Sequence, residues 1–126
     1  MNAPKTILIA DDEPLLTEML EFRLRAKGYG TTVASDGREA LEKFASERPS
    51  AVVLDAMMPV HDGMEVLRRI RMDEQHGDVP VIMLSARRGE EDILRALEAG
   101  ASDYIVKPFL PEELMVRLQR FLAGRL

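Results

Sequence analysis

Short apolar runs alternate along the chain with longer segments in which apolar residues recur every three or four positions. Most of the runs are continuously apolar, which is typical of strands covered on both faces in a parallel sheet. Five strands are therefore predicted, at TILIA (6–10), TTVA (31–34), AVVL (51–54), VPVIML (79–84) and DYIV (103–106).

The segments between the strands have the spacing of amphipathic helices. Five helices are predicted: residues 13–27, a second helix capped by Asp36, residues 64–70, a fourth helix ended by Gly100, and a fifth opened by Pro111. Alternation of strand and helix implies right-handed crossovers and helices on both faces of the sheet. The pattern predicts one α/β domain over residues 1–126, a doubly wound parallel sheet of the (βα)5 type.

Composition narrows the function classes without changing this fold. The chain has 126 residues, 46% of them hydrophobic and 31% charged, which is typical of a globular protein. It has no cysteine, so it has neither disulfides nor thiolate metal ligands, and a reducing compartment is favoured. No apolar run approaches the ~18 residues of a membrane span, and none fits a signal peptide, so a cytoplasmic protein is expected. The net charge of −5 argues against direct nucleic-acid binding. Because the last helix reaches almost to residue 126, no effector domain is expected in this chain.

Polar side chains follow four of the predicted strands. Asp11 and Asp12 come after the first strand, Asp55 after the third, Ser85 after the fourth and Lys107 after the fifth. In open parallel sheets, ligands bind at the carboxyl ends of the strands, near the point where strand order reverses. Three close carboxylates repel one another unless a cation is present, and ligation by oxygen alone favours Mg²⁺. The sequence therefore predicts a magnesium site at this rim.

The strand 51–54 leads directly into Asp55, and the turn residues Pro59 and Gly63 follow. A carboxylate placed beyond a strand end can attack phosphorus to give an aspartyl phosphate. The metal ion, the Lys107 ammonium and the Ser85 hydroxyl would stabilise charge on the transferring phosphoryl oxygens. The resulting hypothesis is that Asp55 is a phosphoacceptor.

These residues resemble the receiver domain of two-component response regulators, in particular the CheY-like single-domain regulators. The resemblance covers nearly the whole chain, and its motifs are specific in combination. They are ILIADDEP (7–14), VVLDAMMPVHDG (52–63), VIMLSAR (81–87) and EAGASDYIVKPF (98–109). The resemblance implies a flavodoxin-like sheet with strand order 2-1-3-4-5 and a cis peptide bond at Lys107-Pro108.

The resemblance also assigns roles to individual residues. It makes Asp55 the phosphoacceptor, assisted by Lys107. Mg²⁺, with Mn²⁺ as the alternative, would be held by Asp12, Asp55 and the backbone carbonyl of Met57, with Asp11 acting mainly through water. Ser85 and the aromatic Tyr104 would form the switch that responds to the phosphoryl group.

The implied function is signalling rather than enzymatic turnover. A sensor histidine kinase or a histidine phosphotransfer protein would supply the phosphoryl group, and slow self-catalysed hydrolysis would remove it. A target protein or output domain would bind the face of the fourth helix, fifth strand and fifth helix, where Tyr104, Phe109 and Leu110 are expected to lie. Dimerisation on phosphorylation is a further expectation, whereas binding to a membrane is not expected.

Simpler roles exist for most of these residues. Asp11 and Asp12 also suit a helix cap, Lys107 an ordinary surface position, and Met57 and Met58 the core. His61 and His76 are expected in loops, exposed to solvent and without acidic partners.

Three other functions compete with the phosphorylation switch. A Mg²⁺-dependent phosphohydrolase would need an acid two residues after Asp55, where Met57 stands. A flavin or nucleotide module would need a glycine- or hydroxyl-rich first loop instead of DDEP. A receiver that acts only as an interaction module would not need all five site residues.

Overall fold

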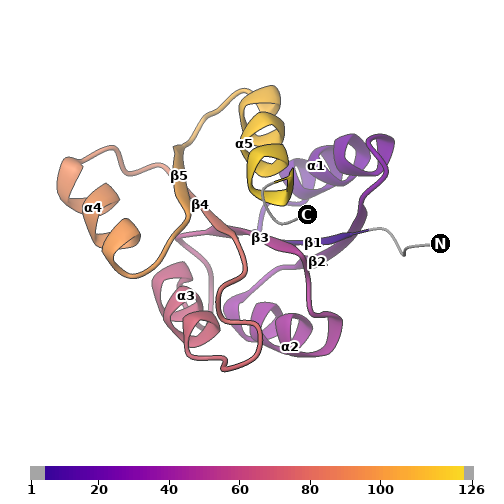
Figure 1. Ribbon diagram of the computed structural model, residues 1–126. Coiled ribbons are helices and arrows are strands. Elements are labelled where there is room, and N and C mark those ends of the chain that lie inside the picture. The colour runs from indigo at the N-terminus through magenta and orange to yellow at the C-terminus, as the bar shows by residue number, and fades with distance from the viewer. Residues whose placement is uncertain (1–4, 124–126) are drawn as a thin grey trace.

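The computed structural model describes residues 5–123 and shows a five-stranded parallel sheet between two layers of helices (Figure 1). The strands are β1 (Thr6–Ala10), β2 (Gly30–Ala34), β3 (Ala51–Asp55), β4 (Val81–Ser85) and β5 (Asp103–Val106). Their order is β2-β1-β3-β4-β5, and every neighbouring pair is parallel. The predicted α/β class and strand order are confirmed.

Helices cover both faces of this sheet. The helices are α1 (Pro14–Ala26), α2 (Gly37–Glu47), α3 (Gly63–Arg71), α4 (Glu90–Glu98) and α5 (Pro111–Ala123). Figure 1 shows α1 and α5 above the sheet, α2 and α3 below it, and α4 beyond the edge formed by β5. Strand order therefore reverses between β1 and β3, and the carboxyl ends of these two strands are adjacent.

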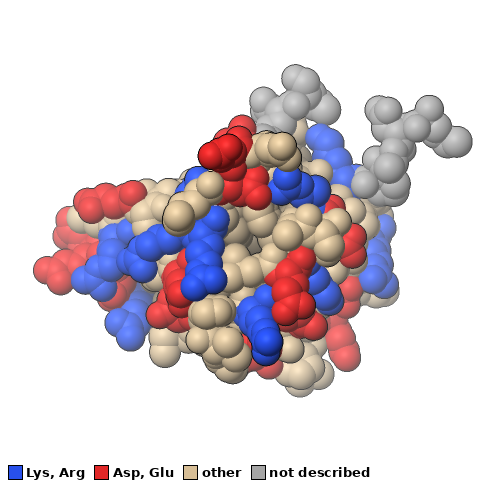
Figure 2. Space-filling view, turned by 90° about the horizontal axis from the view of Figure 1, so that it is seen from below, with Lys and Arg blue, Asp and Glu red and all other residues tan. Residues whose placement is uncertain are grey.

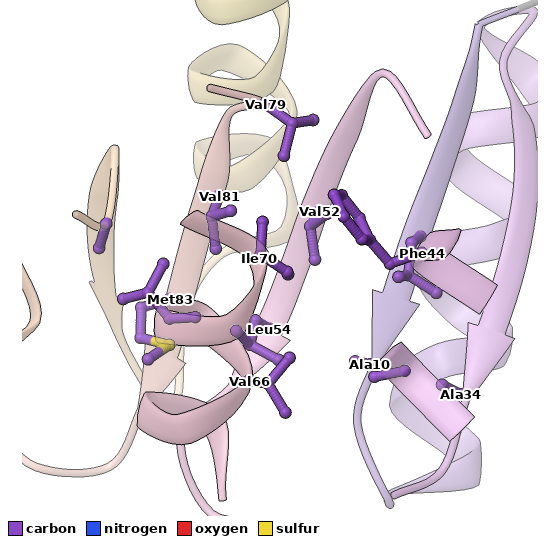
Figure 3. Close-up of a cluster of buried hydrophobic side chains, with 14 of the residues drawn as sticks. Ala10, Ala34, Phe44, Val52, Leu54, Val66, Ile70, Val79, Val81 and Met83 are labelled. Carbon is purple, nitrogen blue, oxygen red and sulfur yellow. The ribbon is translucent and has the colours of Figure 1, made fainter. Parts of the chain in front are cut away.

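The core consists of two apolar layers, one on each face of the sheet. Figure 3 shows the layer between the sheet and helices α2 and α3, where Phe44, Ile70 and Val66 pack on strand residues such as Val52 and Leu54. The other layer joins the sheet to α1 and α5. All residues of β3 and β4 are buried, as their continuously apolar sequences predict. Each fully buried Leu or Ile contributes about 1.5–3 kcal/mol to the stability of the fold. The core can therefore offset the cost of polar groups buried at the rim of the sheet.

The predicted helix ends are present in the structure. Asp36 accepts a hydrogen bond from the Glu39 N–H at 2.8 Å, while the Glu39 carboxylate accepts from the N–H of Ser35 at 2.7 Å. Gly100 follows α4 with a φ of +111°, a left-handed conformation that favours glycine. Pro111 is the first residue of α5.

Candidate functional site

The carboxyl ends of β1 and β3 bring three carboxylates together. Ala10 pairs with Leu54 in the sheet, so Asp11 and Asp12 follow β1 at the level where β3 ends in Asp55. One carboxylate oxygen from each of the three lies within 4.8 Å of the others. Asp11 and Asp55 are buried, whereas Asp12 is exposed. The convergence predicted from the strand ends is confirmed, and the cluster opens to solvent on the Asp12 side.

The Lys107 ammonium, just beyond β5, enters this cluster. Its Nζ lies 2.9 Å from Asp11 Oδ2, 3.1 Å from Glu13 Oε1 and 3.4 Å from Asp55 Oδ2. Burial alone would lower the pKa of Lys107. Hydrogen bonds to Asp11 and Glu13, together with the charges of Asp11 and Asp55, outweigh burial and raise this pKa above its ordinary value. Lys107 is therefore a permanent cation beside Asp55, and its peptide bond to Pro108 is cis, as predicted.

The Asp55 carboxylate is held in an unfavourable environment. Burial is the main cause that raises its pKa, and the charge of Asp11 adds to this. The Met57 N–H, which donates to Asp55 Oδ1 at 3.2 Å, opposes the shift, as does Lys107. The net direction is upward. A further cation would relieve this penalty, and a donor set of carboxylate oxygens without His or Cys fits Mg²⁺.

Ser85 and Tyr104 are connected through the backbone of Arg87. The Arg87 N–H donates to Ser85 Oγ at 3.1 Å, and the Arg87 carbonyl accepts from the Tyr104 hydroxyl at 2.9 Å. Ser85 is buried at the end of β4, and Tyr104 is half-buried on β5. A cavity of about 180 Å³ is lined by Ser85, Arg87 and Tyr104 together with Met57. Ser85 and Tyr104, the two predicted switch residues, are thus both hydrogen-bonded to the Arg87 backbone. The sequence did not reveal this shared partner.

The structure places several nearby residues for which the sequence made predictions, and the prediction for Met57 is wrong. Phe109 packs into the apolar layer of α1 and α5, whereas Tyr104 packs against the opposite layer. Because α4 and α5 also belong to different layers, a partner face that includes both residues stays a prediction. The Met57 side chain is 59% exposed rather than in the core, although Met58 is buried as predicted. Leu110, at 75% exposure, is free to contact a partner.

The prediction that neither histidine has an acidic partner is wrong for His61. His61 Nδ1 lies 2.9 Å from Glu65 Oε1. The signal was available in the sequence, because residues four apart across a helix start are neighbours. The His76 ring packs on Phe44 with ring centroids 5.6 Å apart, and its Nε2 is hydrogen-bonded to the carbonyl of Pro49. Tertiary contacts of this second kind leave no local trace in the sequence.

Surface charge is mixed on the face formed by α2 and α3. Figure 2 shows acidic and basic side chains interspersed there. Pairs such as Arg69 with Glu65 on α3 and Arg38 with Glu42 on α2 account for part of this pattern. Over its described residues this face therefore lacks the continuous basic stripe that typically binds a phosphate backbone. No helix in the described part of the chain is long and apolar enough to cross a membrane.

The family model of the response regulator receiver domain matches residues 7–119. The chain belongs to this family. It is a receiver domain of two-component systems, as the resemblance implied.

Named relatives and solved structures agree with this assignment. The response regulator MprA of Mycolicibacterium vanbaalenii is 45% identical over 94% of this chain and 51% of its own length. The receiver domain of the Francisella response regulator 1452 is 34% identical, with a TM-score of 0.90 over 97% of this chain and 99% of that one. The receiver domain of the Pseudomonas aeruginosa histidine kinase PA1611, solved with magnesium in its active-site cleft, is 36% identical. It has a TM-score of 0.86 and covers 96% of this chain and 99% of that one. The chain spans about half the length of the curated relatives it matches.

Proposed function

We propose that this receiver domain accepts a phosphoryl group on Asp55 from a phosphohistidine of a kinase or phosphotransfer protein, and that the phosphorylated form switches a partner. The observation that carries the proposal is the buried Asp55 carboxylate, with Asp11 and Asp12 within 4.8 Å and the Lys107 ammonium 3.4 Å away. A carboxylate made costly by burial and flanked by a fixed cation is suited to react with phosphorus.

In the transfer step, a carboxylate oxygen of Asp55 forms a bond to phosphorus while the bond from phosphorus to the donor's imidazole nitrogen breaks. The electron pair of that bond stays on the nitrogen, which takes a proton from solvent. Lys107 is placed to bind one phosphoryl oxygen, and Ser85 has a hydroxyl that can donate to another. Asp12, Asp55 and the Met57 carbonyl would hold Mg²⁺, with Asp11 acting mainly through water. When bound, this ion would offset the carboxylate charges and those of the phosphoryl oxygens.

The switch is proposed to run from Ser85 to Tyr104. If the Ser85 hydroxyl turns toward a phosphoryl group on Asp55, the hydrogen bond that it accepts from Arg87 is lost or redirected. The Arg87 carbonyl also holds the Tyr104 hydroxyl, so a movement of this residue changes the position of the aromatic ring. A partner that prefers one arrangement would read the phosphorylated state.

The proposed role is that of a phosphoacceptor, not of a turnover enzyme. An aspartyl phosphate phosphohydrolase would need a general acid near the leaving group, and position 57 is an exposed methionine. The output is proposed to lie outside this chain. Among the relatives twice as long as this chain is MtrA of Mycolicibacterium smegmatis, which is named a DNA-binding response regulator. By analogy with it, the output domain is proposed to act in transcription.

Intact mass spectrometry tests the proposal. Incubation with Mg²⁺ and acetyl phosphate should add one phosphoryl group to the wild type and none to Asp55→Asn. Asp62→Asn is the matched control, because Asp62 caps α3 through the Glu65 N–H and asparagine retains that cap. This control should still be labelled. Labelling of Asp55→Asn would refute Asp55 as the acceptor, and rapid multiple turnover of a phosphomonoester would favour the phosphohydrolase.

A further inference from the structure

Glu13 is a third carboxylate on Lys107 and lies outside the cluster of Asp11, Asp12 and Asp55. Its Oε1 accepts a hydrogen bond from Lys107 Nζ at 3.1 Å, closer than the 3.4 Å between Nζ and Asp55. The position of Glu13 follows from the start of α1, for which it is the N-cap residue. The ammonium therefore makes its two shortest contacts away from the proposed phosphoacceptor.

The two acids that hold Lys107 differ in freedom. Asp11 is fixed, because it is buried and its Oδ1 also accepts the Glu13 N–H at 2.9 Å. The Glu13 side chain is 61% exposed and accepts from no other described group than Lys107. If its contact with Lys107 breaks, the exposed Glu13 carboxylate is solvated by water, whereas Asp11 would be left as a buried, unpaired charge. Glu13 is therefore the partner that can give up Lys107 at little cost.

We propose that Glu13 is a positioning residue, which shares Lys107 with the site in the resting protein and competes with the incoming phosphoryl group for it. This inference rests on the proposed function of Asp55. An ammonium group has three donors, and in the resting protein Asp11, Glu13 and Asp55 surround it. When the contact between Lys107 and Glu13 breaks, the freed N–H of Lys107 can donate a hydrogen bond to a phosphoryl oxygen on Asp55.

The size of the effect follows from the exposure of the pair. Exposed ion pairs contribute little, so removal of Glu13 should speed phosphorylation about two- to fivefold rather than by orders of magnitude. The gain should appear in the maximal rate at saturating donor, because Lys107 contacts the group being transferred. A change confined to the donor concentration at half-maximal rate would instead report weaker repulsion of an anionic donor.

The experiment compares three variants of the whole chain, with acetyl phosphate as donor and saturating Mg²⁺. Glu13→Gln removes the charge, Glu13→Asp keeps the charge but ends one carbon short of Lys107, and Glu18→Gln removes a charge from an exposed position on α1. Glu13→Gln and Glu13→Asp should both raise the maximal rate, whereas Glu18→Gln should match the wild type. Urea unfolding of each variant shows whether the fold is intact.

The outcomes separate this inference from the function on which it rests. If wild type is phosphorylated and Glu13→Gln has the maximal rate of Glu18→Gln, or a lower one, the positioning role is refuted and the function stands. If Glu13→Asp behaves as wild type while Glu13→Gln is faster, charge alone acts and positioning is again refuted. If wild type takes up no phosphoryl group, the proposed function fails and the role of Glu13 fails with it.

Discussion

Replacing Asp55 with asparagine should stabilise the metal-free protein near neutral pH. At an effective dielectric constant of about 20, Lys107 at 3.4 Å attracts the Asp55 carboxylate by about 5 kcal/mol. Asp11, within 4.8 Å, repels it by about 3–4 kcal/mol, and the exposed Asp12 adds about 1 kcal/mol because water screens it. These contributions nearly cancel.

The desolvation of Asp55 therefore decides the sign. Burying a carboxylate costs several kcal/mol, and the single N–H bond from Met57 at 3.2 Å offsets only part of that cost. An asparagine keeps this acceptor and carries no charge. Asp55→Asn should raise the free energy of unfolding by about 1–3 kcal/mol, within the range of buried, imperfectly paired charges.

The effect should depend on pH in a defined direction. Because the folded-state pKa of Asp55 is raised, the folded protein binds this proton more tightly than the unfolded chain does. Wild-type stability should fall as pH rises from the unfolded pKa through the raised folded value, and Asp55→Asn lacks this loss. The stability difference should therefore be small near pH 4 and largest at pH 7.

Urea unfolding followed by circular dichroism, in EDTA, measures this difference. Added Mg²⁺ should stabilise wild type more than Asp55→Asn, because an ion bound only by the folded state adds stability. Asp36→Asn is a control that removes one carboxylate while keeping the cap of α2. A variant equal to or less stable than wild type at pH 7 in EDTA would show that Lys107 outweighs desolvation, and would refute this reasoning.

Three further substitutions test the local structure by urea unfolding. Val60→Gly should stabilise by about 1 kcal/mol, because Val60 has a φ of +72° that a branched residue rarely adopts; a loss would contradict strain there. Arg71→Met should cost about 2–4 kcal/mol, because its guanidinium donates to the carbonyls of residues 77, 79 and 100 at 2.6–2.8 Å, with the exposed Arg69→Met as control. Gly37→Ala should cost about 1–3 kcal/mol, since a Cβ would collide with the carbonyl oxygen of residue 61, whereas Gly89→Ala should cost less. An Arg71→Met loss no larger than that of Arg69→Met, or an equal cost at both glycines, would contradict these readings.

The sequence was sufficient for the fold and for the members of the central cluster. Continuous apolar strands require cover on both faces, and the strand-end rule then places Asp11, Asp55 and Lys107 at one rim. Neither inference depends on the detailed path of a loop. This is why both survive comparison with the structure.

The errors arose where a loop decides which way a side chain turns. Met57 and Met58 are adjacent in the loop after β3, yet Met57 is 59% exposed and Met58 is buried. The direction of Glu13 toward Lys107 likewise depends on a contact that is distant in the chain. Side-chain periodicity carries no information past the end of a strand, so these features needed coordinates.

The energetic cost of burying the Asp55 carboxylate and the hydrogen bonds that link Ser85 to Tyr104 both bear on the proposed switch. A group that binds at Asp55 can shift a conformational equilibrium only by its differential affinity for the two states. Burial raises the pKa of Asp55, so its carboxylate is costly in the resting protein and a bound cation would relieve that cost. In the proposed switch, the Arg87 backbone, which is hydrogen-bonded to both Ser85 and Tyr104, would couple a rearrangement at Ser85 to the tyrosine. In the proposed switch, a group bound at Asp55 therefore acts on Tyr104 through the Arg87 peptide, and it shifts the equilibrium only as far as it prefers one arrangement of these hydrogen bonds.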